Sequence, residues 1–462
     1  MDRFRNTGQD TYRLIVTRRN GSEALLSGGG NAWSLPSVGI SQGQRLAHQL
    51  CAKLYAQSGL RAYCLFVPTF AAAIGHCAVM EVPGDSEIAS AENCWRPLNA
   101  ATCAAMESAD DRAAIETALT QWDECLREPS QAPFARPGWL AELFAWVEHQ
   151  LAALGLHLTG PFRQLNAAPS FSLIQLETND SAVWFKATGE PNRHELGVTT
   201  CVARLFPGSV PEPLGIHAAW NGWLMREAPG RTLDDVPELA WWLETAEGLA
   251  RLQIQSIGRE AELLEGGCMD LRRPRLIGAV DPWIDLMRGL MAEQEKQTPA
   301  QLTDLELTLL GGSLKEACSR LSEIGLTDTL GHLDFNPGNI VVSPERCVFL
   351  DWTEACVTNP FVTFEYLREH FRRHCTDDRT AMESLNAAYM RHWRAHVSLD
   401  DLERAALFSS LVAVFAYAVA TSARRSFEPC GKSSQGAYLR SLARRMFREV
   451  RQIMERSDRC LA

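Results

Sequence analysis

Residues 331–342 read G-H-L-D-F-N-P-G-N-I-V-V, and residues 347–352 read C-V-F-L-D-W. In this stretch Asp334 is followed five residues later by Asn339, and an apolar strand then ends at Asp351. Phosphoryl transfer from a nucleoside triphosphate needs a carboxylate near the attacking hydroxyl and ligands for Mg²⁺. Mg²⁺ is a hard cation that prefers oxygen ligands. The spacing therefore predicts Asp334 as the base that orients and deprotonates a hydroxyl, with Asn339 and Asp351 as Mg²⁺ ligands.

The pattern H-x-D-x-x-x-x-N, followed by an apolar strand and D-W, resembles the catalytic segment of aminoglycoside phosphotransferases and choline kinases. The resemblance covers roughly residues 150–450. It implies a protein-kinase-like fold with a mainly β N-lobe and a helical C-lobe. It also implies an enzyme that uses ATP or GTP with Mg²⁺ to phosphorylate a hydroxyl of a small polar molecule. An aminoglycoside, an amino alcohol, a sugar or a related metabolite would suit this description.

Two charged residues in the expected N-lobe match this family in order and spacing. Lys186 lies in A-V-W-F-K-A-T, which we expect to be a strand. It resembles the family's lysine that contacts the α- and β-phosphates. Glu195, on the helix expected next, resembles the glutamate that holds this lysine. The resemblance thus assigns both residues to the catalytic machinery.

The nucleotide site should also include a hinge and a loop. The segment 224–229 resembles the interlobe hinge, where backbone groups pair with adenine. The loop 166–172, N-A-A-P-S-F-S, would cover the phosphates, and its two serines either donate to phosphate or cap a turn. The expected nucleotide contacts, besides Lys186, are Ser170, Ser172, Arg226, Glu227 and Ala228.

The chain departs from the family pattern at several positions. Leu333 stands where the family usually has Gly, and Thr363 stands where it usually has Asp. The principal positions Lys186, Glu195, Asp334, Asn339 and Asp351 are intact, which favours an active kinase. The alternative is a nucleotide-binding pseudokinase whose N-terminal domain binds a ligand or a partner.

The acceptor site in this family lies between the catalytic loop and the helices before and after it. Here those are residues 258–325 and 365–440. Acidic residues there could meet an amine on the acceptor, or they could be ordinary surface acids. The candidates are Glu354, Glu365 and Glu369.

The N-terminal 126 residues have a separate resemblance. The run W-S-L-P-S-V-G-I-S-Q-G-Q-R-L-A-H-Q-L-C-A-K-L-Y-A-Q-S-G-L, residues 33–60, resembles the glycine-rich turn and box of Nudix hydrolases in outline. This implies an α/β/α sandwich. The family's metal-binding glutamates are replaced, and Ala56 and Gln57 cannot bind metals in their place. The resemblance leaves open substrate capping, ligand sensing or a homodimer formed through this domain. An unrelated α/β domain and a Nudix-type hydrolase are the alternatives.

Local patterns divide the chain into an α/β protein of several parts. Residues 1–126 form the Nudix-like domain, and residues 127–138, R-E-P-S-Q-A-P-F-A-R-P-G, read as a linker because they contain three prolines and a glycine. Residues 139–230 form the N-lobe and hinge. Residues 231–462 form the C-lobe with the substrate site.

Composition excludes several other classes of protein. The formal net charge of -11 argues against nucleic acid or an anionic membrane as a partner, and fits a cationic acceptor. The longest apolar run, residues 405–420, is shorter than the roughly 20 residues a membrane span needs, so we expect a buried helix. The 14 cysteines contain no C-x-x-C pair, and the first residues lack an apolar signal segment. We therefore expect free thiols in the cytoplasm.

Overall fold

The structure is a computed structural model of the chain. It describes residues 9–29, 32–42, 45–69, 75–84, 93–374, 378–424 and 434–461. The chain divides into two compact units. Unit 1 comprises Met1–Leu196 and Pro213–Glu227, and unit 2 comprises Gly197–Glu212 and Ala228–Ala462. The chain passes from unit 1 to unit 2 for the last time between Glu227 and Ala228, inside the segment 224–229 that was predicted as the hinge.

The first sheet of unit 1 is mixed, with strand order β3-β2-β1-β6-β5, while β4 pairs with β1 and β7 pairs with β2. Only β1 and β6 run parallel among the described strands of this sheet. The strands are β1 (Gln9–Arg18), β2 (Glu23–Gly29), β3 (Ala32–Ser34), β4 (Ser37–Ser41), β5 (Tyr63–Phe66), β6 (His76–Glu81) and β7 (Asn93–Pro97).

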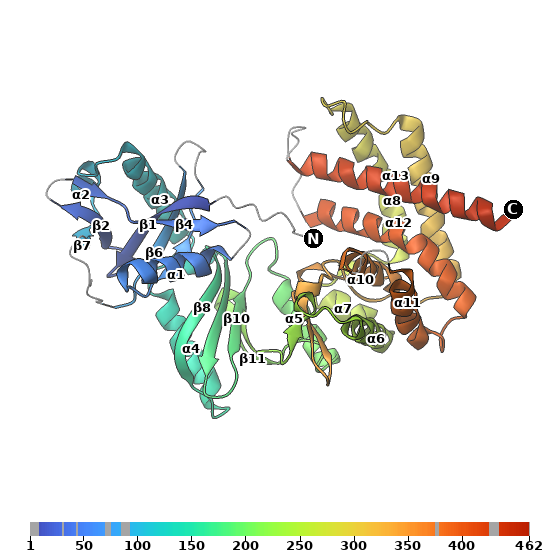
Figure 1. Ribbon diagram of the computed structural model, residues 1–462, viewed down its shortest axis with the longest axis horizontal. Helices are drawn as coiled ribbons and strands as arrows, with labels where there is room; N and C mark the ends of the chain where they lie inside the picture. Colours follow the sequence, from blue (N-terminus) through green and yellow to red (C-terminus); the bar gives the residue numbers. More distant parts are fainter. Residues whose placement is uncertain are drawn as a thin grey trace. The chain divides into compact units, whose positions relative to one another are not determined.

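Helices cover both faces of this sheet. Successive side chains of a strand point to opposite faces. On β1, Leu14 and Val16 belong to the core beneath α1 (Leu46–Ser58), whereas Ile15 belongs to the core beneath α3 (Ala109–Arg127). A shorter helix, α2 (Ala100–Ala104), precedes α3. The arrangement is the α/β/α sandwich expected for residues 1–126 (Figure 1).

The second sheet of unit 1 is fully antiparallel, with strand order β11-β12-β10-β9-β8. It is preceded by α4 (Trp139–Ala152), and α5 (Glu195–Leu205) follows its third strand. The strands are β8 (Leu158–Ala168), β9 (Phe171–Thr178), β10 (Val183–Ala187), β11 (Pro213–His217) and β12 (Gly222–Arg226).

Residues 127–138, expected to be a linker, instead pack into a core that the two sheets share. Pro133–Ala135 form a short 3-10 helix, and Phe134 is 1% exposed. The Phe134 ring makes edge contacts with Trp139, Phe185 and Trp220, at 4.9, 6.4 and 5.8 Å between ring centroids. Prolines mark this segment as irregular, but its apolar residues make it part of the core.

A buried amide also ties the two sheets of unit 1 together. The side chain of Gln164 on β8 is 2% exposed. It donates to the Cys64 carbonyl oxygen and accepts from the Cys64 N–H, both at 2.8 Å. Gln164 therefore satisfies a main-chain donor and acceptor of β5, as a neighbouring strand would.

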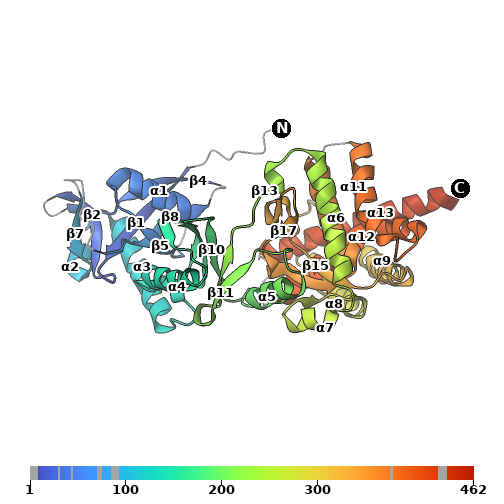
Figure 2. The ribbon, with the colours of Figure 1, turned by 90° about the horizontal axis from the view of Figure 1, so that it is seen from below.

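In its described residues, unit 2 is mainly helical, with two small three-stranded sheets. The sheets are β13-β16-β17 and β14-β18-β15, built from β13 (Arg231–Thr232), β14 (Met269–Asp270), β15 (Thr329–His332), β16 (Ile340–Val342), β17 (Cys347–Phe349) and β18 (Ala355–Thr358). Figure 2 shows α6 beside these strands. The helices are α6 (Leu239–Gln255), α7 (Glu260–Glu265), α8 (Arg273–Ala292), α9 (Asp304–Glu323), α10 (Pro360–His374), α11 (Arg379–Trp393), α12 (Leu399–Arg424) and α13 (Ser434–Leu461).

The apolar run predicted as a buried helix forms α12. Its segment Leu399–Ser422 is long and apolar enough to cross a membrane by length and composition alone. In the structure α12 packs against α8, α9, α10 and α13, and its side chains Leu411, Phe415 and Ala418 are buried. These contacts make α12 a core helix of unit 2.

Candidate active site

The predicted catalytic loop lies between β15 and β16 in unit 2, and a buried histidine orders it. His332 is 1% exposed, and its Nε2 lies 3.0 Å from the Leu350 carbonyl oxygen. Its Nδ1 accepts from the Asp334 N–H at 3.2 Å, so Nε2 is the nitrogen that donates. Burial lowers the pKa of His332, which keeps the ring in this neutral form.

Two asparagines hold the carboxylate of Asp334, the predicted base. Asn336 Nδ2 donates to Oδ1 at 2.9 Å, and Asn339 Nδ2 donates to Oδ2 at 3.1 Å. Asn339 Nδ2 also lies 3.0 Å from the Asp334 main-chain oxygen. Since Asp334 engages the side-chain nitrogen of Asn339, the side-chain oxygen is the atom of Asn339 that can bind a metal.

The loop also brings the two predicted metal ligands together. Leu350 N–H donates to the Asn339 carbonyl oxygen at 2.8 Å, which ties the residue before Asp351 to Asn339. Asp351 adopts a left-handed backbone, with φ 59° and ψ 65°, and its Oδ1 accepts from the Thr353 hydroxyl at 3.0 Å. A left-handed conformation costs a residue other than Gly roughly 1–2 kcal/mol. Such strain is tolerated mainly at functional sites.

The two candidate ligands suit Mg²⁺, which needs few protein ligands, better than a metal ion whose ligands all come from the protein. Across the described residues, no group of three or more His, Cys, Asp or Glu side chains is placed to hold a metal ion. Mg²⁺ commonly binds through one or two carboxylates, with waters and substrate phosphates completing its coordination. One carboxylate and one amide oxygen, from Asp351 and Asn339, meet that requirement.

One position that departs from the family pattern, Thr363, supports the loop, and a buried glutamine on α6 is connected to it through contacts with α10. Thr363, in place of the expected Asp, is fully buried, and its hydroxyl accepts the His332 N–H at 2.8 Å. Gln253 is also fully buried. It donates to the Pro360 carbonyl at 2.9 Å and accepts from the Tyr389 hydroxyl at 2.6 Å. Thr363 thus anchors the loop through a hydroxyl instead of a carboxylate.

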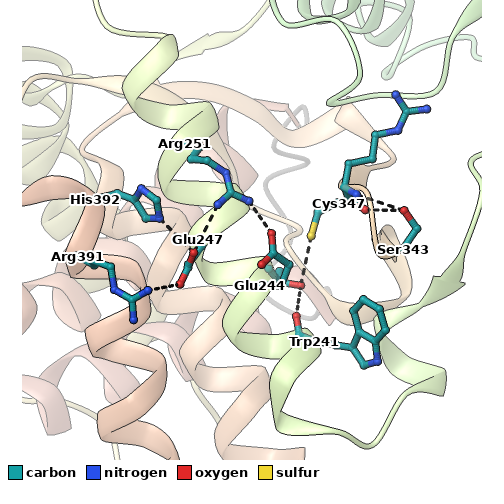
Figure 3. A network of polar contacts seen from close by, with 10 residues as sticks. Trp241, Glu244, Glu247, Arg251, Ser343, Cys347, Arg391 and His392 are labelled. Atoms are coloured by element: carbon teal, nitrogen blue, oxygen red, sulfur yellow. Dashed lines mark hydrogen bonds and ion pairs between the residues drawn. The ribbon is translucent and has the colours of Figure 1, made fainter.

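A polar network on α6 connects the strands behind the loop to α11 (Figure 3). Glu247 accepts from Arg391 at 2.9 Å and lies 3.4 Å from His392 Nε2, both on α11. Two residues before Glu247 on α6, the Thr245 hydroxyl donates to the Trp241 carbonyl at 2.8 Å. The Thr245 hydroxyl also lies 4.0 Å from the Cys347 sulfur of β17. These contacts orient α6 relative to α11 and β17.

Asp334 lies in the wall of a cavity of about 320 Å³, here called the Asp334 pocket. This volume is within the range of small-molecule sites. The catalytic loop, α10, α12 and α13 all contribute to it, and its lining is Leu333, Asp334, Phe335, Glu365, Tyr366, Glu369, His370, Arg373, Ala413, Val414, Tyr417, Tyr438, Leu442 and Arg445. The three tyrosines, His370 and Arg445 were not anticipated from the sequence, because tertiary packing alone gathers them.

Arginines already pair with the acidic candidates of this pocket. Glu365 lies 2.5 Å from Arg368, and burial raises the pKa of Glu365. Glu369 pairs with Arg372, Arg373 and Arg445 at 2.6, 2.9 and 3.5 Å. Burial opposes ionisation of Glu369, but these guanidinium groups together hold its pKa below the usual value.

The third acidic candidate lies apart from the first two. Glu354 belongs to the 3-10 helix Trp352–Glu354, and the described lining of the Asp334 pocket does not include it. The structure therefore brings Glu365 and Glu369 to Asp334 but not Glu354. Neither of the two glutamates in the pocket is left without a guanidinium partner.

In unit 1, the structure brings together the predicted lysine and glutamate. Lys186 Nζ lies 2.5 Å from Glu195 Oε1, and the two residues are 8% and 1% exposed. Lys186 stands in the middle strand of its sheet, and Glu195 is the first residue of α5. Nζ also lies 5.8 Å from the centre of the Trp223 ring. The pair is enclosed by unit 1.

The two serines of the predicted phosphate loop have different surroundings. Ser170 lies in the turn between β8 and β9, where it packs so closely on Gly189 that a Cβ there would be 2.5 Å from the Ser170 Cβ. Ser172 pairs with Ala187, whereas Lys186 pairs with Leu173, so Ser172 and Lys186 point to opposite faces. Its hydroxyl is buried without a hydrogen-bond partner in the described structure. The phosphate contacts predicted for Ser170 and Ser172 stay predictions.

The three predicted hinge residues follow β12. Glu227 N–H donates to the Ala182 carbonyl at 3.0 Å, and its carboxylate accepts from Gln175 and Trp184 at 2.8 and 3.0 Å. Arg226 lies 3.5 Å from Asp180. Both side chains are thus held by unit 1, while Ala228 is the first residue of the second segment of unit 2.

Similarity to known proteins lies mainly in the middle of the chain. Residues 191–408 match the model of a phosphotransferase enzyme family. No curated protein matches the chain. The chain therefore carries a phosphotransferase domain with a sheet-containing N-lobe and a helical C-lobe, and it is a small-molecule kinase.

Solved structures similar to the chain include two phosphotransferases at low identity. A macrolide 2'-phosphotransferase from Brachybacterium faecium is 17% identical, with a TM-score of 0.43, and the match covers 66% of this chain and 98% of that chain. A choline/ethanolamine kinase family protein from Mesorhizobium loti is 14% identical, with a TM-score of 0.42, covering 67% and 94%.

Proposed function

We propose that the protein transfers the γ-phosphoryl group of ATP or GTP to a hydroxyl of a small polar molecule bound in the Asp334 pocket. The observation that carries this proposal is the position of Asp334. Its carboxylate is fixed by Asn336 and Asn339 and faces a cavity large enough for a small molecule. A hydroxyl in that cavity can donate to Asp334.

In this proposal, Asp334 orients the acceptor hydroxyl and takes its proton as the oxygen attacks the γ-phosphorus. The bond from phosphorus to the β,γ-bridging oxygen breaks, and the nucleoside diphosphate leaves. Asn339 and Asp351 would hold Mg²⁺, which neutralises charge on the phosphates when it is bound. Lys186, held by Glu195, would bind the α- and β-phosphates, and the backbone at 226–228 would meet the base.

The acceptor is proposed to be polar and hydroxyl-bearing. Apart from Asp334, the described carboxylates that line the pocket are Glu365 and Glu369, and both already pair with arginines. An amine on the acceptor would therefore have to compete with a guanidinium group for either of them. Tyr366, Tyr417 and Tyr438 offer aromatic faces to a ring-containing acceptor instead. A sugar-like or other ring-containing alcohol therefore suits the pocket better than an acceptor recognised by its positive charge alone.

Residues 1–126 are proposed to be a Nudix-like domain without hydrolase chemistry. The positions that would carry metal-binding glutamates lie on α1, where Ala56 and Gln57 are exposed. We also propose that this domain mediates formation of a homodimer. We also propose a cytoplasmic enzyme, because the described cysteines are all free thiols.

The proposal is tested by incubating the full chain with Mg²⁺, either ATP or GTP, and a panel of alcohols, sugars and amino alcohols. Acceptor-dependent formation of nucleoside diphosphate, with a mass gain of one phosphoryl group on the acceptor, is the expected result. Asp334→Ala should abolish it, and Asp400→Asn, an exposed carboxylate at the start of α12, serves as the matched control. Nucleotide binding without turnover on any acceptor would favour the pseudokinase, and turnover that survives in Asp334→Ala would refute the assignment of the base.

A further inference from the structure

A second cavity, of about 310 Å³, lies within unit 1 and shares no residue with the Asp334 pocket. It is here called the Glu81 cavity. Its walls come from the turn between β1 and β2, from β5 and β6, and from the start of α4; the residues used below are Arg19, Tyr63, Glu81, Leu140, Ala141 and Phe144. Its volume is within the range of small-molecule sites.

Glu81 is a buried carboxylate with one engaged oxygen. The residue is 5% exposed. The Tyr63 hydroxyl and the Gly138 N–H both donate to Oε2, the latter at 2.8 Å. Burial, with a contribution from Glu81 itself, raises the pKa of Tyr63, so this hydroxyl remains a donor. In the described part of the chain, nothing bonds to Oε1, although Glu81 lines the cavity.

Two arginines near this carboxylate are paired with other acids. Arg19, at the cavity wall, lies 3.0 Å from Glu23. Arg136 pairs with Glu142, with nitrogen–oxygen distances of 2.7 and 2.5 Å. No ion pair joins a described Lys or Arg to Glu81. Glu81 contributes to the raised pKa of Arg136, so this cation interacts with it electrostatically, but not in a direct ion pair. A buried carboxylate without a cation in direct contact is costly, and a bound cation would offset that cost.

The turn over the cavity keeps Arg19 with Glu23. Arg19 and Asn20 are adjacent and both left-handed, with φ 51° and 57°, and Gly21 N–H donates to the Arg18 carbonyl at 3.1 Å. Such turns suit hairpins, but an arginine is rarely found in the left-handed region. Arg18 Nε also lies 2.6 Å from Glu23. Glu23 thus binds both arginines of the turn, and neither reaches Glu81.

We infer that the Glu81 cavity is a binding site for a small organic amine, separate from the phosphotransfer site. The ammonium group would donate to Glu81 Oε1, forming the charge-assisted bond that the protein leaves open. The carbon body of the ligand would pack against Tyr63, Leu140 and Phe144. The site gives the N-terminal part of the chain a ligand-binding role that needs no metal.

The test uses 4-fluorobenzylamine as the probe, with its binding to the full chain followed by ¹⁹F NMR. The uncharged 4-fluorobenzyl alcohol has nearly the same shape and serves as the comparison ligand. The amine should bind more tightly than the alcohol. Glu81→Gln should weaken amine binding at least about tenfold, which is the smaller end of the effect expected for losing a hydrogen bond to a charged group.

Two further variants make the outcome decisive. Ala141→Phe changes an exposed position on α4 and leaves Glu81 and its donors in place, but fills the cavity, so it should weaken binding by a similar factor. Glu116→Gln, at an exposed carboxylate of α3, should leave binding unchanged. If Glu81→Gln fails to fold, Ala141→Phe still decides the question.

Several results would overturn the inference. These are absence of amine binding at about 10 mM, a weak limit for a fragment of this size, equal binding of amine and alcohol, or amine binding that persists in Ala141→Phe. Binding that survives in Glu81→Gln but is lost in Asp334→Asn would place the amine in the Asp334 pocket instead. None of these results depends on phosphotransfer activity.

Discussion

Asn339 binds Asp334 through a single nitrogen, which lies 3.1 Å from the carboxylate Oδ2 and 3.0 Å from the main-chain oxygen of the same residue. The candidate base and a candidate metal ligand are therefore one hydrogen-bonded group. A change at either residue should disturb both proton transfer and metal binding. Variants at Asp334 and at Asn339 should therefore be compared, because each is expected to affect both proton transfer and metal binding.

Asp334→Asn should reduce kcat by a factor of about 10²–10⁴, the range for loss of a general base. Asp334 is exposed, so the free energy of unfolding should change little. Diphosphate release in the presence of acceptor measures the loss, with Asp400→Asn as control. A kcat within a factor of about three of the wild type would exclude Asp334 as the base.

Removal of one member of the Lys186–Glu195 pair should destabilise the protein, because it leaves a buried charge without its partner. Both residues are less than one-tenth exposed, and such a loss typically costs about 3–5 kcal/mol. Lys186→Met alone should therefore lower the free energy of unfolding in urea. The double variant Lys186→Met/Glu195→Leu should recover much of it, while nucleotide binding stays weak. An unstable double variant would contradict this reading of the pair.

His332 should make the free energy of unfolding depend on pH. Its pKa is lowered in the folded protein, so below about 6.5 the unfolded chain binds more protons than the folded chain. The stability from this group is thus present above that pH and is lost as pH falls. Urea unfolding from pH 8 to 5 should show a smaller dependence in His332→Asn than in the wild type. His157→Gln, at an exposed histidine, should match the wild type.

Thr363→Val keeps the shape of a buried residue but removes the acceptor of the His332 N–H. An unpaired buried donor costs about 1–3 kcal/mol. We expect lower stability together with lower kcat, because the loop that carries Asp334 begins at His332. Thr380→Val, at an exposed position of α11, is the control. Unchanged stability and kcat in Thr363→Val would show that this hydroxyl does not support the loop.

Gln164→Leu should weaken the association between the two sheets of unit 1. The variant leaves the Cys64 N–H and carbonyl without their buried partners, at a cost of about 1–3 kcal/mol each at most. Since β8 leads into the loop at 166–172, we also expect a higher KM for the nucleotide. Thermal unfolding and nucleotide titration measure the two effects. Gln57→Leu, on the exposed face of α1, is the control.

The sequence predicted helices, strands and the catalytic loop better than it predicted which side chains are buried. The mainly apolar runs at 182–188 and 405–420 located β10 and α12, because such a run bounded by polar residues is enough to indicate a buried element. Spacing alone brought Asp334 and Asn339 together, since both lie on one short loop. The burial of Phe134 was missed because prolines mark irregular backbone and say nothing about whether it is exposed.

Features that depend on distant contacts were beyond prediction. The arginine partners of Glu369 include Arg445, which lies 76 positions further along the chain. The orientation of Ser172 follows from strand register, which a loop-like motif does not contain. The cavity at Glu81 depends on α4 meeting the turn between β1 and β2. Each requires tertiary packing that one sequence does not reveal.

The shared core around Phe134 limits how the gene could be shortened. A chain starting at residue 139 would keep every candidate phosphotransfer residue, yet it would lose the aromatic ring against which Trp139, Phe185 and Trp220 pack. Lys186 follows directly after Phe185 on the same strand. A truncated kinase would therefore expose apolar surface beside its nucleotide lysine and tend to aggregate. Residues 1–138 and the antiparallel sheet that carries Lys186 should therefore be kept together when the protein is expressed or engineered.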